Sequence, residues 1–191
     1  MQTSDSLREQ SDELEALLSR CDLLVSPDEM QATYDRLAGE INRQLAGHLP
    51  VVLAVMNGGL VSAGQIVPRL NFPLELSYLH ASRYRGATSG GALKWLAQPD
   101  IELAGRQVLL IDDILDEGYT LAAVREWCLD AGAARVWIAV ATDKRHDRKV
   151  SGLTADFCGV PVPDRYIFGE GMDYHGHFRN LPGIYALPEG E

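Results

Sequence analysis

The sequence is poor in cysteine and has no long apolar run, and both shortages exclude classes of protein. Its three cysteines, Cys21, Cys128 and Cys158, are odd in number and widely spaced, so they suggest neither a disulfide framework nor a CxxC metal motif. No apolar run reaches the roughly 18 residues of a membrane helix, and no basic segment followed by an apolar stretch begins the chain. We therefore expect a cytoplasmic protein with no membrane partner.

Basic residues are also scarce, since 17 Lys and Arg stand against 27 Asp and Glu and give a formal net charge of -10. Nucleic-acid backbones attract clustered Lys and Arg, so we expect no nucleic-acid partner. An anionic substrate would have to be held locally, by backbone amides, a few cations or a metal. The length of 191 residues and the apolar fraction of 46% suit one domain with a full core.

The apolar pattern predicts an α/β protein whose largely parallel sheet is flanked by helices. Ser26-Pro27-Asp28-Glu29 is typical of a helix start, and apolar residues then recur every three or four positions up to Leu45. A weaker amphipathic pattern over 5–19 predicts a helix that packs through its leucines. Beyond position 51, apolar runs alternate with amphipathic segments. The expected strands are 51–56, 74–82, 108–111, 136–141 and 166–168, and further helices are expected near 60–69 and 120–131.

The most informative segment is an apolar strand that runs into an acidic turn and then a helix. The acids are Asp112, Asp113 and Asp116, and Gly118 and Thr120 follow. Ligands of open α/β sheets bind at the carboxyl ends of strands, and free amides at a helix start can hold a phosphate. Carboxylates next to a phosphate suggest sugar hydroxyls or magnesium. The segment thus predicts a site for a phosphorylated sugar; the alternative is that its acids only cap a helix and solvate a loop.

The run Asp112-Asp113-Ile114-Leu115-Asp116-Glu117-Gly118-Tyr119-Thr120-Leu121 resembles the ribose-phosphate loop of type I purine phosphoribosyltransferases. The resemblance extends from about Val51 to about Leu187, and near the C-terminus it favours the hypoxanthine-guanine branch. It implies a type I phosphoribosyltransferase fold with a small hood built from the chain ends. The expected organisation is one domain over 1–191, with N-terminal helices at 1–48, core sheet and helices at 51–150, and a base-binding hood and C-terminal segment at 155–187.

The same resemblance implies an enzyme of purine salvage. Such an enzyme transfers the 5-phosphoribosyl group of phosphoribosyl pyrophosphate to N9 of hypoxanthine or guanine, with Mg²⁺ as cofactor. By this likeness Asp112 and Asp113 bind the ribose hydroxyls and the metal, and Asp116 is the general base toward purine N7. The 5-phosphate loop runs through Asp116, Glu117, Gly118, Tyr119 and Thr120. Glu117 stands where the family more often has Ser or Thr, and its carboxylate would repel the phosphate unless it points outward.

The resemblance also implies which residues contact pyrophosphate. Asn57-Gly58-Gly59 resembles the pyrophosphate loop, where the family often has a non-proline cis peptide; the alternative is an ordinary strand-to-helix turn. Arg83 and Tyr84, with the Gly-rich stretch 85–91, resemble the loop that closes over the reactive centre, and Tyr84 carries over as a catalytic residue. Arg179 matches a catalytic residue that contacts pyrophosphate.

The resemblance also implies that residues beyond position 140 contact the purine base. Lys144 matches the lysine that binds purine O6, Tyr166 the ring that stacks on the base, and Ile167 its backbone contacts. Asp173 matches a residue of the base and metal sites. His175 and His177 raise the alternative of a zinc site, but two histidines without a third ligand nearby in sequence favour solvated loop residues.

Two other functions remain open in the sequence. One is a relative that prefers xanthine, because the contacts to the 2-position of the base are made by backbone atoms. The other is a regulator that keeps the fold but senses phosphoribosyl pyrophosphate or binds RNA. The resemblance also implies a homodimer or homotetramer.

Overall fold

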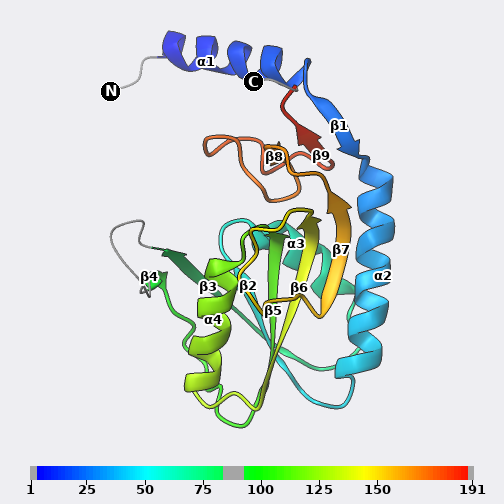
Figure 1. Cartoon of the computed structure of the whole chain (residues 1–191), viewed down its shortest axis with the longest axis vertical. Helices are drawn as coiled ribbons and strands as arrows, with labels where there is room; N and C mark the ends of the chain where they lie inside the picture. The colour runs from blue at the N-terminus through cyan, green and yellow to red at the C-terminus, as the bar shows by residue number, and fades with distance from the viewer. Residues whose placement is uncertain (1–3, 84–92, 189–191) are drawn as a thin grey trace.

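The structure, a computed structural model, describes residues 4–83 and 93–188 and contains two β-sheets (Figure 1). The larger, core sheet has the strand order β4-β3-β2-β5-β6-β7. All neighbouring pairs are parallel except β3 with β4. Its strands are β2 (Val51–Val55), β3 (Glu75–Arg83), β4 (Leu93–Ala97), β5 (Gln107–Leu115), β6 (Arg135–Lys144) and β7 (Phe157–Val162). The α/β class with a mostly parallel sheet is confirmed.

Helices cover both faces of this sheet, as the near-continuous apolar strands require. On one face α2 (Pro27–Leu45) and α3 (Gly59–Ile66) share an apolar core with β2, β5 and β6. On the other face α4 (Tyr119–Asp130) packs over the alternate residues of the same strands. A short 3-10 helix (Val67–Arg69) continues α3. The carboxyl ends of the parallel strands remain uncovered by these helices and point toward the second sheet (Figure 1).

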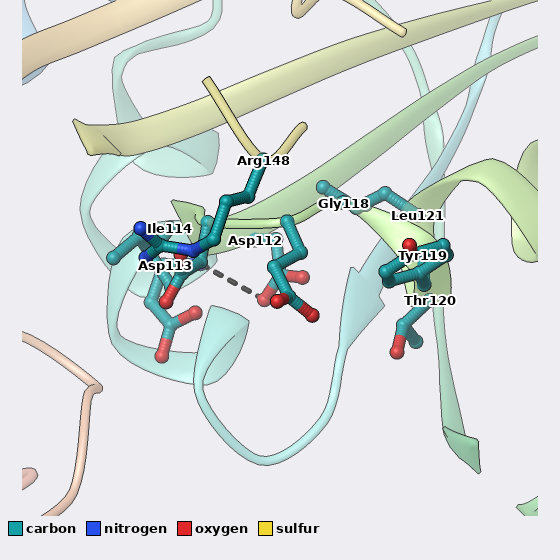
Figure 2. Close-up of a pocket in the computed structure, with 10 residues that line it drawn as sticks. Asp112, Asp113, Ile114, Gly118, Tyr119, Thr120, Leu121 and Arg148 are labelled. Atoms are coloured by element: carbon teal, nitrogen blue, oxygen red, sulfur yellow. Dashed lines mark hydrogen bonds between the residues drawn. The ribbon is translucent and has the colours of Figure 1, made fainter. Parts of the chain in front are cut away.

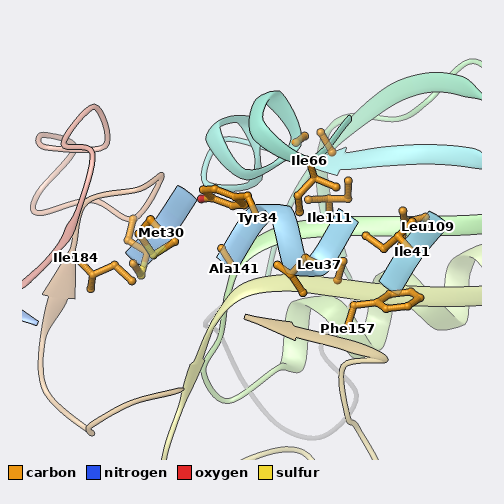
Figure 3. Close-up of a cluster of buried hydrophobic side chains, with 14 of the residues drawn as sticks. Met30, Tyr34, Leu37, Ile41, Ile66, Leu109, Ile111, Ala141, Phe157 and Ile184 are labelled. Carbon is orange, nitrogen blue, oxygen red and sulfur yellow. The ribbon is translucent and has the colours of Figure 1, made fainter. Parts of the chain in front are cut away.

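Helix α2 forms as the sequence predicts. Ser26 accepts a hydrogen bond from the Glu29 N–H, and the Glu29 side chain accepts one from the Ser26 N–H, which completes the capping box. The repeated apolar residues form one buried face against the sheet (Figure 3). They are Met30, Tyr34, Leu37, Ile41 and Leu45.

Strand β5 is longer than the apolar run at 108–111 indicates. Its pairing with β6 continues from Asp112 opposite Val140 to Leu115 opposite Asp143. The prediction that Asp112 and Asp113 lie in a turn is therefore wrong, because a paired neighbour strand extends β5 through both acids. Asp116 is the first acid beyond the strand.

The second sheet forms a hood from both chain ends. Its antiparallel order is β1-β9-β8, from β1 (Asp22–Val25), β8 (Ile167–Phe168) and β9 (Ile184–Ala186). β1 and β7 do not follow the expected boundaries, since β1 joins the hood from the segment 1–48 and β7 joins the core sheet from the segment 155–187. β1 lacks a long apolar run of its own, and β7 is defined by its parallel pairing with β6.

Helix α1 (Ser4–Leu18) forms, but the expected packing through its leucines is wrong. None of its residues is buried, and Leu7 is half exposed. The helix extends along the outside of the hood (Figure 1), and Leu14, Leu17 and Leu18 are only partly buried. Among the helices that the structure describes, none is long and apolar enough to cross a membrane.

Candidate active site

Two adjoining cavities lie at the carboxyl ends of the core strands. The larger has a volume of about 520 Å³ and follows the end of β5 and the start of α4 (Figure 2). It is lined by Asp112, Asp113, Ile114, Asp116, Glu117, Gly118, Tyr119, Thr120, Leu121 and Arg148. The smaller, of about 280 Å³, is lined by Asp113, Ile114, Asp116, Lys144, Tyr166, Ile167, Met172 and Asp173. Three residues of β5 and its end line both cavities, so ligands in the two would meet there.

Asp112 and Asp113 form an acidic pair inside β5. The Asp113 N–H donates to Asp112 Oδ1 at 2.9 Å (Figure 2), which fixes one carboxylate against the strand. Burial, and then the charge of Asp113, raises the pKa of Asp112 well above its usual value. Burial also raises the pKa of Asp113, although Arg179 opposes this shift. Two adjacent acids that resist joint ionisation, Asp113 buried and Asp112 partly buried, are suited to bind a cation or hydroxyl donors.

The larger cavity ends at the amino terminus of α4. Gly118 precedes the helix with a φ of 82°, a left-handed conformation that glycine adopts without strain. The first amides of α4 have no partner within the helix, so this end can hold an anion. Glu117 is exposed and also lines this cavity. The Glu117 carbonyl is held from behind by the Val150 N–H at 2.8 Å.

The loop 56–59 packs against the acidic pair. The Met56–Asn57 peptide is cis, as the resemblance suggested. A Cβ atom on Gly58 would lie 1.9 Å from Asp113 Oδ2, and one on Gly59 would lie 2.4 Å from the Ile111 carbonyl oxygen. On the other side, a Cβ atom on Gly171 would lie 2.2 Å from the Gly58 carbonyl oxygen. Glycine is therefore needed for three segments to meet around Asp113.

Asp116 has two hydrogen-bond donors, Lys144, which lines the smaller cavity, and His146, whose side chain is buried. Lys144 Nζ lies 2.8 Å from Asp116 Oδ2, and His146 Nε2 lies 2.6 Å from Asp116 Oδ1. Burial alone would raise the pKa of Asp116, but the hydrogen bonds from Lys144 and His146 outweigh it and lower that pKa below its usual value. Asp116 is therefore a carboxylate at neutral pH and can accept a proton.

The hood forms the other wall of the smaller cavity. Tyr166 is 48% exposed, and its hydroxyl lies 3.4 Å from the Asp173 carbonyl oxygen. Its ring meets Tyr174 edge to face, with centroids 5.8 Å apart. Ile167 is buried directly after it in β8. An exposed aromatic ring at a cavity mouth can stack on a flat base.

Arg179 joins the hood to the acidic side of the site. Arg179 Nη1 donates to the Gly171 carbonyl oxygen at 2.6 Å, and Nη2 lies 2.5 Å from Asp173 Oδ1. The Gly176 N–H donates to the other Asp173 oxygen at 2.7 Å. These bonds fix the Asp173 carboxylate, while the positive charge of Arg179 faces the buried acids of β5.

Asp112, Asp113 and Asp173 do not form a ready-made metal cage. Within the parts of the chain that the structure describes, no group of three or more His, Cys, Asp and Glu side chains could hold a metal ion. Mg²⁺, however, usually takes one or two carboxylates and completes its shell with water and substrate phosphates. The carboxylates of Asp112 and Asp113 fit that mode, because a dication would offset their mutual repulsion.

The remaining predicted residues are in the covering loop, of which the structure describes little, and in the exposed part of the hood loop. Tyr84 and the stretch 85–91 lie outside the described residues, and for Arg83 only the backbone, at the end of β3, is described. His175 and His177 are exposed in the hood loop, as expected for solvated residues.

Two residues of the site were missed by sequence reasoning. His146 contacts Asp116, and Arg148 lines the larger cavity while it pairs with Asp164 through bonds of 2.7 and 2.9 Å. Both follow the carboxyl end of β6 in a charged run, Lys144-Arg145-His146-Asp147-Arg148-Lys149. The rule that ligands bind at strand ends, applied to this strand as it was to β5, would have selected them.

Comparison with known proteins identifies the class to which this fold and site belong. Residues 26–175 match the model of the phosphoribosyl transferase domain family, and the chain belongs to that family. The resemblance found in residues 112–121 is thereby confirmed.

Individual relatives agree with this class. The hypoxanthine-guanine phosphoribosyltransferase of Streptococcus pneumoniae is 31% identical over 87% of this chain and 93% of its own length. The hypoxanthine-guanine-xanthine phosphoribosyltransferase of Tritrichomonas foetus is 31% identical over 87% of this chain and 91% of its own. A solved structure of the Bacillus anthracis hypoxanthine-guanine phosphoribosyltransferase aligns with a TM-score of 0.80 at 29% identity, covering 87% of this chain and 96% of that one.

Proposed function

We propose that the protein transfers the 5-phosphoribosyl group of phosphoribosyl pyrophosphate to N9 of hypoxanthine or guanine, releasing pyrophosphate. One observation carries the proposal: the cavity that suits a phosphorylated sugar and the cavity that suits a base share Asp113 and Asp116. The anomeric carbon and the base would therefore meet beside a carboxylate. The names of the relatives support the same activity.

In the larger cavity, Asp112 and Asp113 accept hydrogen bonds from the ribose hydroxyls. The 5-phosphate occupies the amino end of α4, where backbone amides of 118–120 and the Thr120 hydroxyl point to it. The pyrophosphate lies between the loop Asn57-Gly58-Gly59 and Arg179, next to Asp113. We also assign Arg83 and Tyr84 to the loop that covers this group.

In the smaller cavity, the base stacks on Tyr166 and contacts the backbone at Ile167. Lys144 donates to O6, which hypoxanthine, guanine and xanthine share and adenine lacks. Asp116 faces N7 of the same base: His146 holds its Oδ1, and its Oδ2 is released to the cavity when Lys144 turns to O6. The T. foetus relative is named for xanthine as well, and O6 recognition alone leaves xanthine as a second candidate substrate.

The charged groups around the two cavities suit a substitution at the anomeric carbon. N9 forms a bond to the anomeric carbon while the bond from that carbon to pyrophosphate breaks, and its electron pair leaves with pyrophosphate. Arg179 neutralises the leaving group, and Asp116 takes the N7 proton as the purine becomes positively charged on forming the N9 bond. Mg²⁺, held by Asp112 or Asp113 with substrate oxygens, would supply further positive charge to the pyrophosphate. Asp173 orients Arg179 and water near that ion.

We further propose that the protein is a cytoplasmic homodimer or homotetramer. Large apolar side chains on α3, β3 and β4 are more than half exposed, which is typical of a surface that another subunit covers. They are Leu60, Leu76, Tyr78 and Leu96. Light scattering behind a sizing column tests the assembly, and a monomer at micromolar concentration would contradict it.

The test of the activity is direct. Purified protein with Mg²⁺ and phosphoribosyl pyrophosphate is offered hypoxanthine, guanine, xanthine, adenine or uracil, and nucleotide is quantified by chromatography. Product from hypoxanthine or guanine, but not from adenine, is expected. Folded protein that binds phosphoribosyl pyrophosphate but forms no nucleotide from any base would instead indicate a regulator.

A further inference from the structure

We propose that His146 is a positioning residue for the general base, because it holds Asp116 from behind in a fixed orientation that leaves Asp116 Oδ2 for the purine. The inference rests on the proposed transferase function and assigns to that reaction a residue outside the motif at 112–120. It starts from the two contacts that the imidazole ring makes.

Both nitrogens of His146 are occupied. The Arg148 N–H donates to Nδ1 at 3.0 Å, so Nδ1 is an acceptor and carries no proton. Nε2 lies 2.6 Å from Asp116 Oδ1, and in the neutral ring it must carry the proton and donate it to that oxygen. The backbone at Arg148 thus selects the tautomer that can bind a carboxylate.

Binding of the purine affects the two donors of Asp116, His146 and Lys144, differently. The His146 side chain is only 3% exposed, so it lies behind Asp116 and cannot contact a ligand in the cavity. Lys144 lines the cavity and must turn toward purine O6, which weakens its bond to Asp116 Oδ2. When the base enters, His146 is therefore the donor that keeps Asp116 in place.

The consequence for the proton transfer is specific. Without His146 the Asp116 side chain, which is 41% exposed, could rotate once Lys144 had turned to O6. With His146 on Oδ1, only Oδ2 is presented to N7, and it accepts the proton as the N9 bond forms. Orientation of this kind affects the chemical step more than the binding of phosphoribosyl pyrophosphate.

The experiment uses two variants that differ by one methylene. The amide nitrogen of His146→Gln can reach the place of Nε2, whereas the shorter side chain of His146→Asn cannot. We expect kcat with hypoxanthine to fall about 10- to 100-fold in His146→Asn, with KM for phosphoribosyl pyrophosphate within about twofold of wild type. We expect His146→Gln to recover most of the loss. His48→Asn, on an exposed turn at the other end of the strands, is the matched control.

Two further measurements separate the possible failures. In an Asp116→Asn background, His146→Asn should lower kcat no further, because residues that act as one unit are not additive. Nitrogen-15 spectra of histidine-labelled protein should show His146 protonated at Nε2 and not at Nδ1. If the wild type is active and His146→Asn keeps the same kcat, or if the spectra show the opposite tautomer, only the role of His146 is overturned. A wild type that makes no nucleotide from any base would overturn the proposed function, and the role of His146 with it.

Discussion

Gly58→Ala offers a sharp test of the site, because the atoms nearest to the new methyl group belong to Asp113, a proposed ribose ligand. The backbone φ of Gly58 is -60°, which alanine adopts readily. The added Cβ would nevertheless lie 1.9 Å from Asp113 Oδ2 and 2.4 Å from Asp113 Cγ. Either the Asp113 carboxylate turns away or the loop 56–59 withdraws from β5.

Each response has a calculable cost. If Asp113 turns, the enzyme loses hydrogen bonds between a carboxylate and ribose hydroxyls, worth about 1.5 to 3 kcal/mol. This loss corresponds to a rise of about 10- to 150-fold in KM for phosphoribosyl pyrophosphate. If the loop withdraws instead, overpacking costs about 1 to 3 kcal/mol of the free energy of unfolding, and the pyrophosphate contacts are displaced. KM for phosphoribosyl pyrophosphate rises in both cases.

The matched control is Gly64→Ala in α3, the helix that Gly58 directly precedes. A Cβ atom on Gly64 has no neighbour within 4 Å, so this variant should gain about 0.5 to 1 kcal/mol of stability from helix propensity and keep its kinetics. Initial rates at varied phosphoribosyl pyrophosphate and urea unfolding of both variants measure the two effects. A KM within twofold of wild type in Gly58→Ala would refute the placement of Asp113 against the substrate.

Three other predictions concern the base and the hood. Asp116→Asn should lower kcat by about 10²- to 10⁴-fold with little change in KM for phosphoribosyl pyrophosphate, as steady-state kinetics will show. Lys144→Gln should reduce kcat/KM for hypoxanthine by at least about tenfold, and competition between bases should show weaker exclusion of adenine. Burial raises the pKa of Glu170, although its carboxylate accepts a hydrogen bond from the Tyr34 hydroxyl at 2.8 Å. Folding therefore favours the protonated form of Glu170. This contribution to stability is lost as the pH rises above 4.5, the usual pKa of a glutamate. Urea unfolding should show that Glu170→Gln removes this part of the pH dependence.

Features encoded by nearby residues were predictable from the sequence. Helix α2 has its start signal and its buried face within 20 residues, and both form as expected. The segment 112–120 was recognisable because its acids, its glycine and the start of the next helix follow one another closely in the sequence. Local geometry of this kind requires no knowledge of the rest of the fold.

Features that depend on distant partners were not predictable. β5 extends through its acids only because β6 pairs with it. His146 is 30 residues from Asp116 in the chain, and no local pattern connects a histidine in a charged run to that carboxylate. The amphipathic pattern of α1 predicts a helix but cannot say whether this chain supplies a surface for it.

The pairing of β5 with β6 also explains why the two groups proposed to contact the base lie together. In this parallel register Leu115 is opposite Asp143, so the next residues along the two strands, Asp116 and Lys144, extend side by side from the sheet. A slip of one residue would reverse the faces of a strand that is buried on both sides, and the apolar cores on the two faces oppose it. The packing that stabilises the sheet therefore also sets the distance between a proton acceptor for N7 and a donor for O6.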